Sequence, residues 1–499
     1  MKNLLIFLSF VLFVLSACKK DNSFKNSSPA RLQQLQVSKI SPSDVTEGML
    51  VSISGIDLGT SANGLTVYFN DKQAIIRSVE PTKIEVIVPK TSSGEVTFKM
   101  NGTAVSTSSH LTFTYYTSTD FQNDVNLTNQ ADIDNFVETH KGQRLNVNGN
   151  LSIGKSNESN DIQSVTGLSG IINSVSGLIS LSYLRIADAP FLNTVTAAGG
   201  LRVAICDFKS LNLSSLQKFS GDLFLSGLNK LTQLEIRSLV TVNNLEISFC
   251  PLITDITGLN TVESATSVRI GFLGVSAINM ENLISVTSNG INFSFNKNLS
   301  AINFKSLNKV NGQLYVYACP QLYQLNFKAL KSVSGRLMIY GSNISDLNGF
   351  GAIQSLGALN LTANPLLTTL QGLEQLNSLE LPGITGVVTN GVIFGLGGLE
   401  ASMGGIAIES NPKLISLSGL QNVKTLAIAK ISNNPLLNDL CPLKNPILKL
   451  KSAPIFTYTE YNVPAGQYHY NRTVAALDLW GNGTYTDTED ELKVIEHCN

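Results

Sequence analysis

The chain has little charge, because Asp, Glu, Lys and Arg make up only 14% of its 499 residues, about half the usual share. Its formal net charge is −1, so electrostatics gives no reason to expect a nucleic-acid partner. The apolar content of 43% excludes general disorder. A folded chain this poor in charge needs small polar residues in its turns, and the sequence is rich in Asn, Ser, Thr and Gly.

The sequence also lacks the patterns of familiar catalytic and metal sites. Neither a His-Glu-x-x-His nor a Gly-x-Ser-x-Gly motif occurs, and no Cys-x-x-Cys pair or His partner accompanies Cys206, Cys250 or Cys319. The four histidines are far apart in the sequence: His110, His140, His469 and His497. We therefore expect no catalytic residue, no metal, no cofactor and no enzymatic activity.

The first seventeen residues have the pattern of a signal peptide. Lys2 precedes an apolar run, residues 4–14, which is too short to span a bilayer. The next residues, Leu15-Ser16-Ala17-Cys18, resemble a bacterial lipobox. This resemblance implies cleavage before Cys18 and acylation of that residue, and several acyl chains anchor a protein firmly. We expect a lipid-anchored protein of the bacterial outer membrane, exposed at the surface; an ordinary secretory signal is the alternative.

One short phrase recurs through the chain at a nearly fixed spacing. The steps between its strand-start residues are 22, 22, 23, 23, 23, 23 and 22 residues, for Leu201, Leu223, Leu245, Val268, Ile291, Leu314, Leu337 and Leu359. A period in the twenties is typical of a solenoid, whose coils bury their apolar edges by stacking. Less regular strands are expected to start at Leu151, Leu184, Leu379 and Ile406, with a glycine-rich loop before the last.

Small residues recur at the turn five positions after each strand start. They are Cys206, Cys250, Asn296, Cys319, Asn364 and Asn411. A column of Asn would satisfy buried turn amides, and Cys fits the same small space. We interpret the three cysteines as members of this column; metal binding is the alternative.

The repeated phrase resembles the leucine-rich repeats of receptor L domains. Residues 357–370, GALNLTANPLLTTL, match its framework, and the resemblance covers residues 143–440. It implies a protein or glycan ligand on the face of the stacked strands. Before the solenoid, residues 18–35 are predicted to form a flexible tether. Residues 36–117 resemble an IPT/TIG immunoglobulin-like β-sandwich, which would act as a spacer.

Both ends of the solenoid need caps, since an open end exposes apolar edges and unpaired strands. Residues 118–142, with a helix over 128–140, are the predicted N-terminal cap, and residues 441–499 the C-terminal one. There Thr488 and Glu491 form a capping-box pattern. Cys441 and Cys498 can form a disulfide in an oxidising exterior; two free thiols are the alternative.

The side chains that alternate with the core residues indicate where a ligand would bind. Tyr317 and Tyr340 should lie side by side, with Tyr315 next to Met338, and Gln313 and Arg336 precede their strands on the same face. These six residues are the candidate ligand site, although aromatic pairs can also serve the sheet alone. A second aromatic group, which includes Trp480, is expected to pack partly on the last coil.

The sequence thus predicts a mainly β protein, an immunoglobulin-like sandwich followed by a capped β-solenoid. Its expected function is that of a membrane-anchored, non-catalytic surface scaffold that binds a macromolecule, protein or glycan. A glycan-binding lipoprotein of a polysaccharide-utilisation system and a purely structural envelope component are the alternatives.

Overall fold

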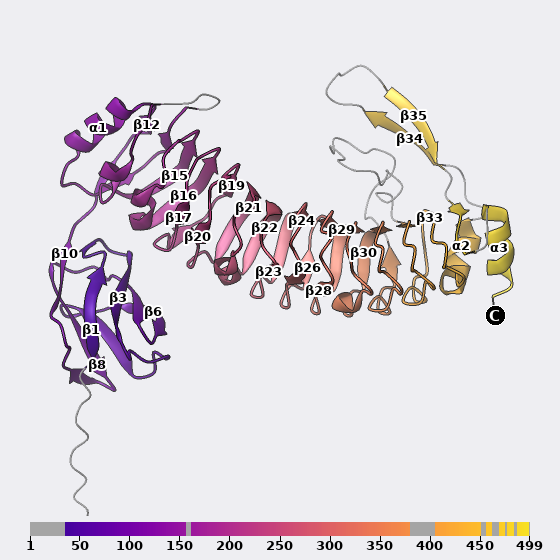
Figure 1. Cartoon of the computed structure of the whole chain (residues 1–499), viewed down its shortest axis with the longest axis horizontal. Coiled ribbons are helices and arrows are strands. Elements are labelled where there is room, and N and C mark those ends of the chain that lie inside the picture. Colours follow the sequence, from indigo (N-terminus) through magenta and orange to yellow (C-terminus); the bar gives the residue numbers. More distant parts are fainter. Residues whose placement is uncertain are drawn as a thin grey trace, which may run out of the picture.

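A computed structural model describes residues 35–155, 161–379, 405–450, 456–461, 469–474, 477–483 and 487–498. The fold is mainly β, with 42% strand and 11% helix. A sandwich lies at one end of a long, curved solenoid (Figure 1), which confirms the predicted fold class. Cys18, the tether up to residue 34 and the glycine-rich loop before Gly405 lie outside the described residues.

The N-terminal domain is a β-sandwich of two sheets. One sheet has the order β1-β3-β7-β6 and the other β2-β10-β8-β4-β5, with β9 paired to β8. Alternate residues such as Val51, Ile53, Val67 and Phe69 point inward and are buried. The strands are β1 (Gln36–Ser41), β2 (Asp44–Val45), β3 (Leu50–Ile56), β4 (Leu65–Phe69), β5 (Lys72–Gln73), β6 (Ile75–Glu80), β7 (Lys83–Ile87), β8 (Gly94–Met100), β9 (Thr103–Val105) and β10 (Leu111–Tyr115).

Side chains of the sandwich contact the first coils of the solenoid. The Thr46 hydroxyl donates to Asn173 Oδ1 at 2.5 Å, and Arg77 donates to Gln217 Oε1 at 3.1 Å. The Glu85 carboxylate lies 3.8 Å from the Arg237 guanidinium. Polar contacts from three separate sandwich elements therefore hold the two domains together.

Parallel strands stacked coil upon coil form the main sheet of the solenoid. All seven predicted steps are confirmed, because each strand-start residue from Leu201 to Leu359 pairs with the next. The strands are β11 (Thr119–Phe121), β12 (Val125–Leu127), β13 (Leu145–Val147), β14 (Leu151–Ile153), β15 (Ile172–Ser182), β16 (Ala197–Ala204), β18 (Lys218–Phe219), β19 (Leu223–Ser226), β21 (Thr241–Cys250), β22 (Ser264–Leu273), β24 (Ser285–Ser294), β26 (Lys309–Val310), β27 (Leu314–Tyr317), β29 (Ser332–Tyr340), β30 (Ser355–Thr362), β31 (Ser378–Leu379), β32 (Ile406–Glu409), β33 (Ala429–Ser432) and β36 (Leu477–Trp480).

A second edge of the coils forms smaller parallel sheets, and inward side chains of all edges meet in one core. Stacked phenylalanines run through this core, with Phe304 and Phe327 at 5.5 Å and Phe327 and Phe350 at 5.0 Å between ring centroids. Second-edge strands are β17 (Ser210–Asn212), β20 (Gln233–Glu235), β23 (Ala277–Asn279), β25 (Ala301–Asn303) and β28 (Gln324–Asn326). Short 3-10 turns fill this edge elsewhere: η1 (Thr166–Leu168), η2 (Pro190–Thr194), η3 (Thr257–Thr261) and η4 (Asn348–Phe350).

The irregular coils differ from the prediction in two places, at Leu184 and Leu379, whereas the predicted strand start at Ile406 is confirmed. Leu184 lies in a turn, since Ile179 is the residue that pairs with Leu201. Leu379 pairs with Leu356 and does not start a coil; the partner of Leu359 is instead Ile406. Because an insertion replaced the regular turn spacing there, the 22-to-23-residue template misplaced the next strand.

The N-terminal cap helix, α1 (Gln130–Thr139), begins at the N-cap Asn129 and buries Ile133 against the first coil. It lies between β12 and β13, so the sheet already begins at β11, ahead of the predicted start at residue 143. The first strands escaped prediction because they are only three residues long.

The C-terminal cap contains η6 (Cys441–Leu443), α2 (Lys444–Leu450), β34 (Phe456–Tyr461), β35 (His469–Val474), β36 and α3 (Thr488–Glu496). The β34–β35 hairpin extends away from the solenoid (Figure 1). Cys441 and Cys498 form a disulfide with a Cα–Cα distance of 5.6 Å. The capping-box prediction is wrong, because Asp487 is the N-cap of α3. Glu491 turns inward instead, where its carboxylate accepts from the amide of Asn482 at 3.0 Å.

Candidate functional site

Five aromatic rings on five successive coils form one continuous row along the solenoid. Ring centroids are 4.3 Å apart for Phe249 and Phe272, 4.6 Å for Phe272 and Phe295, and 4.7 Å for Tyr317 and Tyr340, all in stacked geometry. Phe295 and Tyr317 meet edge to face at 5.2 Å. We call these five residues the aromatic ridge. At about 4.8 Å a step, it is roughly 19 Å long.

The backbone of the coil explains where the ridge lies. The residue four positions after each strand start has a left-handed conformation, with φ of 53°, 56° and 55° at Phe249, Phe272 and Phe295. Glycine stands at this position in other coils, as Gly227 and Gly341. A bulky residue here costs about 1–2 kcal/mol relative to glycine. The fold thus accepts glycine, and three phenylalanines occupy the position despite the strain.

The ridge keeps one ring per coil although the rings come from two sequence positions. In the first three coils the ring is the fourth residue after the strand start, and the third is small: Ser248, Gly271 and Ser294. In the next two coils Tyr317 and Tyr340 are the third residue, and Ala318 and Gly341 follow. The aromatic ring therefore moves from the fourth to the third residue after the strand start, and the small residue moves from the third to the fourth. The row of rings stays continuous in space although its sequence position shifts by one residue.

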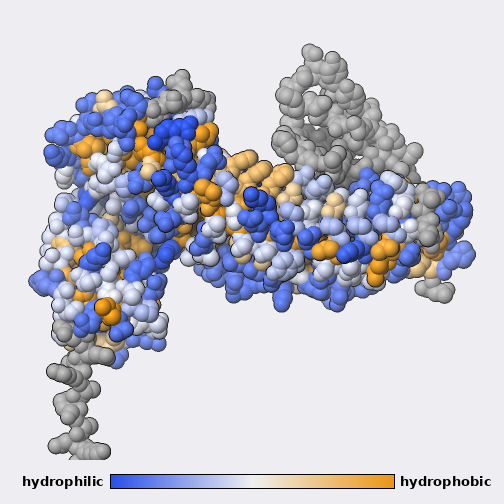
Figure 2. Space-filling model, viewed as in Figure 1, coloured by the Kyte–Doolittle hydropathy of each residue, from blue (hydrophilic) through white to orange (hydrophobic). Residues whose placement is uncertain are grey.

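Much of the ridge is open to solvent. Phe249 is 50% exposed and Phe295 44%, and Ile205 extends the apolar surface at the same turn position with 41% exposed. Phe272, Tyr317 and Tyr340 are half-buried between neighbours. Figure 2 shows apolar surface gathered over the upper ends of strands β21 to β24. Clustered exposed apolar side chains on a solenoid face are typical of a contact surface.

The predicted ligand residues lie where their register requires, but not all of them are exposed. Tyr317 pairs with Tyr340 and Tyr315 with Met338, as expected. Gln313 is exposed and Tyr315 half-buried. The expected exposure of Met338 and Arg336 is wrong, since they are only 5% and 8% exposed.

The reason is a change in the strand face itself. In three successive coils the outward residue directly after the strand start is closed to solvent: Met338 is 5% exposed, Asn360 0% and Ala407 2%. The second outward residue of these strands, Tyr340, Thr362 or Glu409, is half-buried. Alternation along a strand shows which side chains leave the solenoid core, but not whether something else covers them. The candidate site therefore lies further toward the N-terminus than predicted.

Sequence reasoning missed the three phenylalanines of the ridge. Only the first and third residues after each strand start were read as outward-facing, whereas the rings stand at the turn. A usable signal existed, because Phe249, Phe272 and Phe295 are spaced by 23 residues, the period of the repeat. Each also directly precedes the turn column, where Cys250, Leu273 and Asn296 follow.

Charged side chains border the ridge on its N-terminal side. The Arg202 guanidinium lies 4.2 Å from the centroid of the Phe224 ring, and Arg269 lies 3.3 Å from the Glu246 carboxylate. Both pairs bridge neighbouring coils on the outward face. The ridge thus has an apolar centre with a polar margin, the arrangement found in protein interfaces.

The three cysteines of the turn column are buried and face backbone carbonyls. Cys206, Cys250 and Cys319 are at most 1% exposed, and burial raises the pKa of each thiol to about 11. Their Sγ atoms contact backbone carbonyls; that of Cys250, for example, lies 3.2 Å from the Ser248 oxygen. Within the described ranges, no group of three or more His, Cys, Asp or Glu residues is placed to hold a metal.

In the other aromatic group, of which only part was expected to cover the last coil, Trp480 ends β36 beside Ser432 and is 43% exposed. The remaining side chains of that group lie outside those described. No helix in the described part of the chain combines the length and apolar character that a membrane crossing requires.

Comparison with known proteins identifies the first domain. Residues 35–115 match the IPT/TIG domain family, in agreement with the observed sandwich. No curated protein matches the chain. The similar solved structures include two from Bacteroides thetaiotaomicron VPI-5482. One is a structural genomics protein of unknown function, 20% identical over 17% of this chain and 22% of that one, with a TM-score of 0.15.

The other is described as a putative phosphatase; it is 22% identical over 20% of this chain and 22% of that one, also with a TM-score of 0.15. The chain thus spans about a fifth of each matched structure. Neither likeness supports an inference about fold or function. The chain is an IPT/TIG domain followed by a parallel β-solenoid.

Proposed function

We propose that this protein is a non-catalytic scaffold that binds a macromolecular partner, a protein, along the aromatic ridge. The observation that carries the proposal is the run of Phe249, Phe272 and Phe295 at a strained turn position where glycine is accepted elsewhere. Strain retained at an exposed position is a sign of selection for something other than stability. Partly exposed aromatic rings supply much of the binding energy in protein interfaces.

The stacking geometry favours a protein over a sugar. Rings 4.3–4.7 Å apart cover one another's faces, so the ridge offers mainly ring edges to a ligand. A sugar that stacks on an aromatic platform needs a free face, whereas apolar side chains pack well against edges. The charged residues at the margin, Arg202, Glu246 and Arg269, would then orient the bound protein, while the aromatic rings supply most of the binding affinity.

A glycan remains the second candidate, on the strength of one ring. Gly227 stands at the ridge position of the coil before Phe249, so no side chain of that coil stacks on the outer face of Phe249. This face is available to a single sugar ring. A purely structural role, in which the rings only stabilise the stacked coils, is the third candidate.

The proposal includes the anchor. Acylation at Cys18 would tie the protein to the bacterial outer membrane, and the IPT/TIG domain would hold the solenoid away from the lipid surface. Wild-type protein should incorporate labelled palmitate in bacterial cells and partition with membranes. The Cys18→Ser variant should do neither; labelling of that variant would contradict the assignment.

The ligand proposal is tested with a soluble form that starts at residue 35. It is screened against a protein panel and a glycan array, and any hit is measured with a Phe249→Gly, Phe295→Gly variant. Tyr323→Ala is the matched control, because Tyr323 is 64% exposed but lies outside the ridge. A protein hit weakened tenfold or more by the ridge variant alone supports the proposal. A glycan hit weakened by Phe249→Gly alone supports the second candidate.

A further inference from the structure

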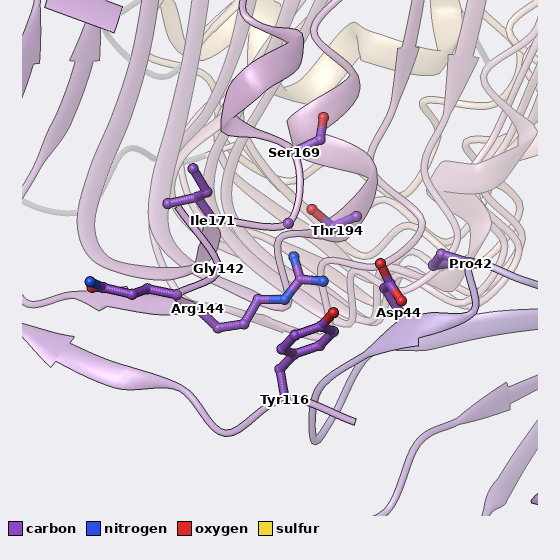
Figure 3. Close-up of a pocket in the computed structure, with 10 residues that line it drawn as sticks. Pro42, Asp44, Tyr116, Gly142, Arg144, Ser169, Ile171 and Thr194 are labelled. Carbon is purple, nitrogen blue, oxygen red and sulfur yellow. The ribbon is translucent and has the colours of Figure 1, made fainter. Parts of the chain in front are cut away.

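A cavity of about 320 Å³ lies where the sandwich meets the solenoid, at the lower end of the range for small-molecule sites. Asp44 and Tyr116 line it from the sandwich side, and Arg144, Gly170 and Thr194 from the first coils. Figure 3 shows the Arg144 guanidinium above the Tyr116 ring, directed toward Thr194 and Asp44. The cavity is separate from the aromatic ridge, which spans strands β21 to β29.

Arg144 is a largely buried cation that faces the cavity, and the Asp44 carboxylate in the same lining attracts it electrostatically. Arg144 is 9% exposed, and its guanidinium carbon lies 4.6 Å from the centroid of the Tyr116 ring. That contact uses the face of the ring and none of the five N–H donors. Across the described part of the chain, no residue forms a hydrogen bond or ion pair with this guanidinium. The Asp44 carboxylate attracts this cation through space, but the five N–H donors are left for water or for a ligand in the cavity.

The backbone is shaped around this side chain. Gly170 has a φ of +77°, and a Cβ there would lie 2.0 Å from Arg144 Nη1. Gly102, in the sandwich and outside the cavity wall, has a φ of +81° but nothing within 4 Å of an added Cβ. Gly170 is thus needed both for its conformation and for the room that it leaves the guanidinium. The two glycines make a matched pair for an experiment.

The charges around the cavity narrow the ligand class. Arg144 matches a carboxylate bidentately, while the exposed Asp44 carboxylate at the rim repels a second negative charge and accepts from hydroxyl donors. A sulfate or a phosphate dianion would therefore be disfavoured. We propose that the cavity binds a small hydroxylated monocarboxylate, its carboxylate on Arg144 and its hydroxyls toward Asp44 and Thr194. Since both domains line the cavity, such a ligand also stiffens the junction.

The direct test is calorimetric titration of the purified full chain with D-glucuronate, D-galacturonate and D-lactate. At least one should bind saturably at millimolar concentration or below, and D-glucose, which lacks the carboxylate, should bind at least tenfold more weakly. Absence of saturable binding by all three acids would overturn the proposal. So would equal binding of glucose, or tighter binding of sulfate.

Variants locate the binding. Arg144→Gln should weaken binding tenfold or more, and Gly170→Ala should do the same by displacing the guanidinium. Gly102→Ala carries similar backbone strain outside the cavity and should bind as the wild type does. Asp44→Asn should weaken the hydroxylated acid and strengthen sulfate. Circular dichroism checks that each variant is folded; if Gly170→Ala folds and binds unchanged, the cavity is not the site.

Discussion

The two halves of the solenoid fill the same turn position in different ways. In the N-terminal half, apolar or weakly polar side chains stand there: Leu184, Cys206, Leu228, Cys250 and Leu273. The position holds Asn296, Cys319 and Ser342 in the middle coils, and from Asn364 onward it is a ladder of asparagines, Asn364, Asn411, Asn434 and Asn482, each 0% exposed. The same turn geometry therefore accepts either an apolar side chain or a hydrogen-bonding one. Accordingly, the turns of one half are stabilised by apolar packing and those of the other by side-chain hydrogen bonds.

The ladder is continuous and ends at a charge. The backbone N–H of Asn364 donates to Asn411 Oδ1 at 3.1 Å and that of Asn411 to Asn434 Oδ1 at 3.0 Å. Asn434 donates to Asn482 and Asn482 to the Glu491 carboxylate of helix α3. The strand faces differ in the same sense, with the exposed ridge in the first half and a partly closed face in the second. The first half is suited to contact a partner and the second to hold the array together.

The largest expected effect comes from breaking the ladder in its middle. Asn411→Ala removes the acceptor of the Asn364 N–H and the donor to the Leu361 carbonyl, leaving two buried groups unpaired at ~1–3 kcal/mol each. Urea unfolding should show a loss of about 4 kcal/mol. Cys250→Ala, at the same position of the other half, should lose only about 1 kcal/mol. Equal losses would show that the two halves do not differ.

The next effect concerns the disulfide that holds the C-terminal cap. Cys441 and Cys498 are 57 residues apart, and opening a loop of that size costs about 3–4 kcal/mol. Because each coil is stabilised by its neighbours, loss of the cap should expose the last coils first. In the Cys441→Ser, Cys498→Ser variant, amide hydrogen exchange should rise in β32 and β33 and stay unchanged in β21 and β22. A uniform rise would contradict this.

A smaller effect depends on pH. Burial raises the pKa of Glu491 to about 7 from the ordinary 4.5 of a glutamate, so between these pH values the folded state holds a proton that the unfolded state has released. Stability from this group is present below pH 4.5 and is lost as pH rises through 7, by no more than about 3 kcal/mol. Glu491→Gln keeps an acceptor for Asn482 and should remove this dependence. An identical pH profile in wild type and variant would refute the assignment.

The smallest effect on stability is expected at the ridge. Phe249→Gly loses ring stacking worth about 0.5–1.5 kcal/mol and relieves a left-handed φ of 53° worth about 1–2 kcal/mol. The free energy of unfolding should change by less than about 1 kcal/mol. A loss above 3 kcal/mol would mean that the ridge is part of the fold and favour the structural role.

Most of the fold could be predicted because its signals are local and repeated. Leu314 and Val316 alternate with Tyr315 and Tyr317 in one coil, and seven equal steps fix the register of the rest. The template failed at Leu379, where 47 residues separate the paired Leu359 and Ile406. A fixed period identifies coils only where the spacing between strand starts is constant. The period itself does not show where an insertion ends and the next regular coil begins.

The site was harder to predict because exposure is not a local property. Tyr317 and Tyr340 were found by alternation, and their stacking follows from register. Met338 alternates in the same way yet is 5% exposed. The role of Glu491 at the end of the asparagine ladder was missed, because a glutamate fits that role and a capping box equally well. Asp487 decides between them, by taking the N-cap position itself.

The central claim is that the exposed ridge of the first half binds the partner. It is tested most directly by the ratio of dissociation constants for one protein hit, measured with the Phe249→Gly, Phe295→Gly variant and with Tyr323→Ala. We predict a loss of tenfold or more for the ridge variant, with unchanged unfolding free energy, and less than twofold for the control. Equal affinities for both variants and the wild type would contradict the claim.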